Sequence, residues 1–114
     1  SVTIGTPIVL NPLVTPTVIT QAHGLAGLPT CVTAVLECLV ADGGFAVGAL
    51  IFVDASKMPA DFGIDGGITI LQDSTNIKLI VGSRVYGLIE GASAGATFIL
   101  TNASWKLTIT PYKW

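Results

Sequence analysis

The chain has 114 residues and a formal net charge of −2; 51% of its residues are hydrophobic and only 11% are charged. That length suffices for one domain with a single core, but ordinary domains carry about 25% charged residues, so we expect a neutral surface or one covered in an oligomer. The basic residues are scattered and the longest apolar run, residues 46–53, is far shorter than a membrane-spanning helix, which argues against nucleic acid and membrane as partners.

The amino-terminal segment, residues 1–20, is rich in Thr, Val and Ile and contains Pro7, Pro12 and Pro16. Proline is excluded from helix interiors and from central strands, so we expect an extended segment. It is either an arm that docks on a neighbouring subunit or an ordinary edge strand. Residues 21–114 are assigned to one β-sandwich domain.

The longest predicted strand covers residues 32–40, VTAVLECLV, and follows a turn-rich connection. Its even positions form an unbroken apolar row that predicts a core face: Val32, Ala34, Leu36, Cys38 and Val40. The odd row is mixed. We assign Val35 and Leu39 to a second buried surface, either the edge of a facing sheet or a subunit interface, and Glu37 is the residue that tests this assignment.

The sequence Asp-Gly-Gly at residues 42–44 predicts a hairpin turn directly after this strand. Residues 45–54 predict the next strand. Because both rows are apolar at residues 50–53, we expect that strand to be covered on both sides. Residues 57–67 are polar and glycine-rich and predict a solvated loop.

The second half of the chain predicts further strands at residues 67–71, 76–81, 84–90 and 104–114, with a short TFIL segment ending at residue 100. Tight turns are expected at Gly82-Ser83 and Asn102-Ala103, and a small-residue loop at residues 91–97. Two inward rows follow from the alternation: Ile77, Leu79 and Val81 in one strand, and Trp105, Leu107 and Ile109 in the last.

Turn signals recur every eight to twelve residues, and no segment sustains a period of 3.6. This pattern is typical of an all-β protein, and it predicts an antiparallel β-sandwich or barrel.

The sequence offers no recognisable catalytic combination, so we expect a protein that is not an enzyme and has no cofactor. The only histidine, His23, fits a turn residue whose ring bonds local backbone. In a homotrimer, copies of His23 near the axis would instead form a candidate metal site. Cys31 and Cys38 are too far apart along one strand for a disulfide, so both are expected to be free thiols, with Cys38 in the core.

Aromatic residues crowd the carboxyl terminus. Trp105 belongs to an inward row and is expected in the core. Tyr112 and Trp114 follow Pro111 and are candidates for a subunit contact or for a ligand such as a sugar ring.

The segment HGLAGLPTCVTAVLECLVADGGFAVG (residues 23–48) resembles a module of bacteriophage tail fibres and related virion proteins. The later sequences STNIKLIV and NASWKLTI are similar to the same module, so the resemblance covers about residues 20–114. It implies a compact, jelly-roll-like antiparallel β-sandwich that assembles as a homotrimer, in a style similar to the H-type lectins, and we expect about eight strands. It brings no catalytic residues, and no lectin-type site maps onto this sequence residue by residue.

From this resemblance we expect a non-enzymatic structural protein of a bacteriophage particle, located in the virion and in contact with other virion proteins. A short chain that begins at Ser1 favours a stand-alone capsid decoration or cement protein over a fibre. The alternative is a receptor-binding module of a tail fibre, which would recognise host surface glycans through the loops at residues 57–67 and 91–97 or through the terminal aromatic residues.

Overall fold

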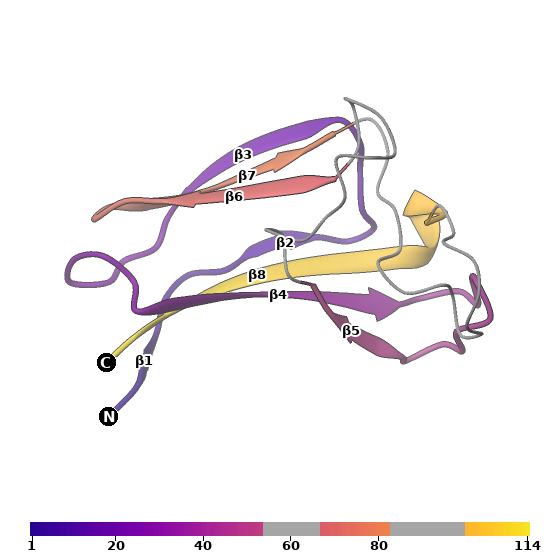
Figure 1. Ribbon diagram of the computed structural model, residues 1–114, viewed down its shortest axis with the longest axis horizontal. Coiled ribbons are helices and arrows are strands. Elements are labelled where there is room, and N and C mark those ends of the chain that lie inside the picture. The colour runs from indigo at the N-terminus through magenta and orange to yellow at the C-terminus, as the bar shows by residue number, and fades with distance from the viewer. Residues whose placement is uncertain (54–66, 83–99) are drawn as a thin grey trace.

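The computed structural model describes residues 1–53, 67–82 and 100–114, and these residues form two antiparallel sheets in two layers (Figure 1). The predicted all-β class and the antiparallel pairing are confirmed. Several predicted segments lie outside the described residues. They are most of the loop at residues 57–67, the turn at Ser83, the strand at 84–90, the loop at 91–97 and most of the TFIL segment.

The five-stranded sheet is built around the last strand of the chain. Its strands are β1 (Thr3–Ile4), β2 (Ile8–Leu10), β4 (Cys31–Cys38), β5 (Leu50–Phe52) and β8 (Trp105–Lys113). The order is β1–β8–β4–β5, and β2 pairs with the same edge of β8 as β1. The central pair, β4 and β8, is in register from Cys31 opposite Tyr112 to Cys38 opposite Trp105.

The three-stranded sheet contains β3 (Thr17–Ala22), β7 (Asn76–Val81) and β6 (Ile68–Gln72), in that order. The first twenty residues therefore take part in both layers. Residues 3–4 and 8–10 pair with β8, Leu13 is buried at 2% exposure, and residue 17 begins β3.

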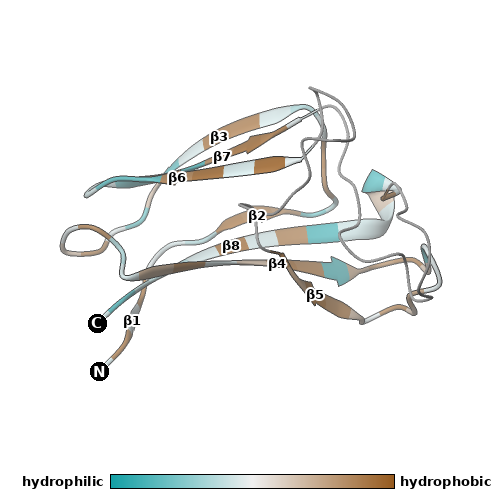
Figure 2. Cartoon of the chain, viewed as in Figure 1, coloured by the Kyte–Doolittle hydropathy of each residue, from teal (hydrophilic) through white to brown (hydrophobic). Residues whose placement is uncertain are grey.

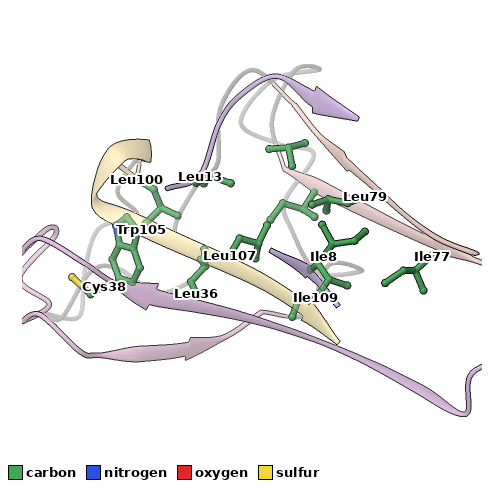
Figure 3. Close-up of a cluster of buried hydrophobic side chains, with 13 residues drawn as sticks. Ile8, Leu13, Leu36, Cys38, Ile77, Leu79, Leu100, Trp105, Leu107 and Ile109 are labelled. Carbon is green, nitrogen blue, oxygen red and sulfur yellow. The ribbon is translucent and has the colours of Figure 1, made fainter. Parts of the chain in front are cut away.

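One cluster of buried side chains joins the two layers (Figure 3). Both predicted inward rows are confirmed, because Ile77, Leu79, Trp105, Leu107 and Ile109 are each 0% exposed and Val81 is 2% exposed. Each such side chain contributes about 1.5–3 kcal/mol when it is fully buried. These two rows, which face each other from different sheets, hold the layers together.

The long strand is shorter than predicted. β4 ends at Cys38, and Val40 is 58% exposed, so the prediction that Val40 belongs to the core row is wrong. The reason lies at the start of β8. The N–H groups of Leu39 and Val40 both donate to the carbonyl oxygen of Ser104, at 2.7 and 3.3 Å, which ends the regular ladder. Ala34, Leu36 and Cys38 are buried as predicted, and Val32 packs against the cluster.

The hairpin turn at residues 42–44 is confirmed: Asp42 and Phe45 form an antiparallel bridge, and Gly43 and Gly44 have φ values of 58° and 84°. The strand predicted for residues 45–54 is reduced to Leu50–Phe52. The prediction that this strand is covered on both sides is also wrong within the chain, since Leu50 is 58% and Phe52 75% exposed. β5 pairs with β4, and its alternate side chains point away from the core.

Candidate functional site

The described residues leave the outer face of the five-stranded sheet without a covering layer. We define it as the side chains that point away from the three-stranded sheet, which alternate with the buried ones. They are Ile4, Val9, Cys31, Thr33, Val35, Glu37, Leu50, Phe52, Lys106, Thr108, Thr110 and Tyr112.

Strand register arranges these side chains in rows across the sheet. Val9, Thr108, Val35 and Phe52 lie side by side in one row, on β2, β8, β4 and β5. Such neighbours across antiparallel strands have Cβ atoms about 5 Å apart. The row is therefore a continuous band of methyl groups that ends in an exposed aromatic ring.

This face is more apolar than a solvated sheet surface. Phe52, Ile4, Leu50 and Val9 are 75%, 66%, 58% and 48% exposed. The hydropathy colouring shows that β5 and much of β4 consist of apolar residues, inward and outward ones together (Figure 2). Sheets with one face in water usually alternate apolar and polar side chains, and large exposed apolar patches mark interaction surfaces.

Among the described residues, the outer face carries two charged side chains, Glu37 and Lys106. They have opposite signs and lie opposite each other in the register of β4 and β8. The face is thus neutral as a whole, but its charge is localised at one row, next to the exposed Leu50 on β5.

The candidate residues from the sequence fall in three places. Val35, Glu37 and Tyr112 lie on the outer face and are half-buried. Leu39 is also half-buried but follows the end of β4. Trp114 is 65% exposed at the chain end, where its backbone N–H donates to the Thr30 hydroxyl at 3.1 Å.

His23 lies at a different place, in a junction between the two layers. It is 1% exposed; its Nδ1 accepts a hydrogen bond from the Leu25 N–H, and its Nε2 donates to the Asp73 carbonyl oxygen, both at 3.0 Å. The two bonds fix the tautomer, with the proton on Nε2. Neither ring nitrogen has a free lone pair for a metal, and no cluster of three or more His, Cys, Asp or Glu residues occurs in the described part of the chain.

The backbone of His23 also joins separate segments. Its N–H donates to the Thr75 carbonyl at 3.0 Å, and its own carbonyl accepts the Thr6 N–H at 2.9 Å. Gly5 packs directly against this carbonyl, since a Cβ at Gly5 would lie 2.7 Å from the oxygen. We call this set of contacts the His23 junction. It ties the N-terminal segment to the β6–β7 turn.

A second junction, centred on Asp42, was not predicted. Its Oδ2 accepts hydrogen bonds from the Trp105 indole N–H and from the Thr101 N–H, both at 2.8 Å, and its Oδ1 accepts the Thr101 hydroxyl at 3.1 Å. Burial acts to raise the pKa of this carboxyl, but the hydrogen bonds from Thr101, Trp105 and Gly43 together outweigh it and hold the pKa below its usual value. A buried tryptophan needs an acceptor for its N–H, and that is the one signal in the sequence for this contact.

Asp73 has a related role in the β6–β7 turn. Its Oδ1 accepts the N–H groups of Asn76 at 2.7 Å and Thr75 at 2.8 Å. These two bonds, in that order of importance, lower the pKa of its carboxyl. The polar groups at both junctions therefore stabilise turns and join segments, and the described residues bring no nucleophile next to a base.

No family model matches the chain, and comparisons with curated proteins and with solved structures found no match either. Within the described ranges, no helix is long and apolar enough to cross a membrane.

Proposed function

We propose that this chain is a non-enzymatic structural protein of a bacteriophage particle, a homotrimeric capsid decoration protein on the virion surface. The observation that carries the proposal is the outer face, where the described residues combine large apolar side chains such as Phe52, at 75% exposure, with one pair of opposite charges. A surface of this kind is suited to permanent contact with protein. The resemblance of residues 23–48 to virion modules points to the kind of particle.

The proposed architecture is a jelly-roll-like β-sandwich. Two antiparallel sheets whose buried residues form one cluster support it. The N-terminal segment fits the role of a docking strand as well as an edge strand, because β1 and β2 lie at the edge of their sheet.

The proposed mechanism is burial of surface between subunits and between the trimer and other virion proteins. A standard interface hides about 1,600 Å² in total. Many symmetry-related copies would each add such an area, so the shell would resist internal pressure through the sum of individually ordinary contacts.

The test is to label purified particles with antibodies raised against the chain and to view them by electron microscopy. Regular labelling over the head is expected. In heat or chelator, the heads of particles that lack the protein should also break down more readily than the heads of complete particles. Absence of label from the particle, or unchanged head stability without the protein, contradicts the decoration role.

A second candidate is a receptor-binding module that recognises host glycans, and one observation favours it. Trp114 is 65% exposed and Tyr112 lies on the outer face close to it. Exposed aromatic rings stack on the apolar faces of sugars. Labelling at the tail tip, together with glycan-array binding that Trp114→Ala abolishes, would support this candidate and contradict the decoration role.

A further inference from the structure

Each strand of the five-stranded sheet contributes a column of side chains to the outer face, and these columns are arranged evenly about the middle of the sheet. Viewed from outside, the strands follow the order β1/β2, β8, β4, β5, so two columns lie on each side of the line between β8 and β4. Lys106 and Glu37 occupy the two columns that flank this line. Val9 and Phe52 occupy the two outermost columns of a neighbouring row.

This order has a consequence for packing between copies. When identical faces surround an axis that runs parallel to the strands, the β4 column of one copy meets the β8 column of the next. In the same way, β5 meets β2, which lies in the same rows of the sheet. The geometry holds for a twofold axis and for the threefold axis of a trimer, because in both cases the left half of one face meets the right half of another.

We propose that the outer face packs against the outer faces of other copies of this chain around such an axis, with Glu37 next to Lys106 of the neighbouring copy and Phe52 next to its Val9. This inference rests on the homotrimer in the proposed function and assigns its contact surface. The occupant of the face is a second copy of the same chain.

Charge complementarity selects this arrangement. An axis that crosses the strands at the row of Glu37 would bring Glu37 against Glu37 and Lys106 against Lys106. Like charges brought together at an interface cost several kcal/mol. An axis parallel to the strands brings only opposite charges together, and it also places the exposed aromatic ring of Phe52 on an exposed valine.

The described strands supply about half of the flat area that a standard contact needs from each partner. The five strands together have 25 residues, and at about 3.3 Å per residue and about 4.8 Å between strands they cover about 400 Å² before side-chain relief is counted. A standard interface needs about 800 Å² from each partner. Val2 and Trp114, at 59% and 65% exposure, flank the far ends of β1 and β8 and extend the same apolar surface.

The closing experiment measures association of the purified chain by sedimentation equilibrium, with circular dichroism to verify folding. Glu37→Lys and Lys106→Glu are each expected to weaken association by about tenfold or more, which corresponds to about 1.4 kcal/mol. The double variant Glu37→Lys/Lys106→Glu should restore it. Lys78→Glu is the matched control, because Lys78 lies on β7 between the buried Ile77 and Leu79 and so points outward from the other sheet.

Mixing separates repulsion between copies from repulsion within one chain. In the Glu37→Lys chain both charges of the face are positive, and in the Lys106→Glu chain both are negative. Each variant alone should associate about tenfold or more weakly than the wild type, whereas the mixture should associate more tightly than either, because a mixed assembly regains most of its opposite-charge contacts. Repulsion within a chain cannot be relieved by mixing.

A second pair of variants guards against misfolding. Phe52→Lys, at an exposed position of the edge strand, should abolish association, and Val18→Lys, at a 63% exposed position of β3, should not. The inference is overturned if the folded wild type is a monomer at micromolar concentration, or if it associates and Glu37→Lys and Phe52→Lys leave association unchanged. If either of these results is obtained and antibodies still label the head of the particle, the decoration role stands and only the contact surface proposed here is wrong. If the particle is not labelled at all, the proposed function itself is wrong.

Discussion

At the His23 junction, three segments that are distant in the sequence meet through hydrogen bonds, and the ring at their centre is 1% exposed. On the outer face, Phe52 is 75% exposed, and the neighbours in its row are valines and a threonine. The first region uses its polar groups within the chain. The second leaves its apolar groups without a cover among the described residues. The polar groups of this chain thus secure its fold, and its exposed apolar side chains gather on a face that contributes little to the core.

The largest expected effect comes from removing the ring at the junction. His23→Ala deletes two hydrogen bonds and leaves a cavity, so the free energy of unfolding should fall by about 3–4 kcal/mol, measured by urea denaturation. His23→Asn is the control. Its side chain can still accept the Leu25 N–H but does not reach Asp73, so it should recover about 1 kcal/mol. A loss under about 1 kcal/mol for His23→Ala would show that the junction is not a major source of stability.

Asp42→Ala should lower the free energy of unfolding by about 2–3 kcal/mol, because it leaves the buried Trp105 indole N–H without an acceptor. Thr101→Val removes only the hydroxyl bond and should cost less than about 1 kcal/mol. Equal costs for the two variants in thermal denaturation would contradict the central role of the indole bond.

The same carboxylate predicts a dependence on pH. The folded pKa values of Asp42 and Asp73 lie below the unfolded value of about 3.9. The unfolded chain therefore binds more protons in this range, so stability is present above about pH 4 and is lost as the pH falls through the folded pKa values. Asp42→Asn should flatten the acid limb of a plot of unfolding free energy against pH, and an unchanged limb would assign the effect elsewhere.

Gly5→Ala tests how tightly the N-terminal segment packs on the junction. Its Cβ would lie 2.7 Å from the His23 carbonyl oxygen and 2.9 Å from the Pro111 ring, so one of these groups must shift. Overpacking of this kind costs about 2 kcal/mol. Thr6→Ala, at the exposed neighbouring position, should change stability by less than about 0.5 kcal/mol. If Gly5→Ala and Thr6→Ala have equal, small effects on the free energy of unfolding, then the N-terminal segment moves aside to make room for the Cβ.

The smallest expected effect on folding comes from the outer face. Phe52→Lys should change the free energy of unfolding by about 0.5 kcal/mol or less when it is measured at a dilution where no association is detected. Val35→Ala, at a half-buried position in the same row, should cost more. If Phe52→Lys instead unfolds the isolated chain, then the ring contributes to the core, and the contrast between junction and face is wrong.

Alternation along the chain was enough to predict much of the fold. The inward rows of β4, β7 and β8 follow from a period of two, because each strand has one face on a shared core. The same rule failed at residues 50–53, where both rows are apolar. Periodicity cannot tell a strand covered on both sides from an edge strand with an exposed apolar face, and among the described strands β5 is the latter.

The junctions were beyond sequence reasoning for a different reason. The Nε2 of His23 bonds a carbonyl 50 residues away and Asp42 bonds an indole 63 residues away, so the partners become neighbours only when the sheets have formed. Local turn chemistry indicated that both residues lie in turns. It carried no information on which distant groups they satisfy.

The break in strand pairing between β1 and β2 affects how readily another strand can add to this edge of the sheet. The N–H groups of Gly5 and Thr6 turn inward to Pro111 and His23, and Pro7 has no N–H to offer. A foreign strand that approached this border of the sheet would meet a broken row of donors, and natural sheets use such breaks to prevent edge-to-edge polymerisation. The broken row of donors thereby discourages open-ended strand pairing along this border.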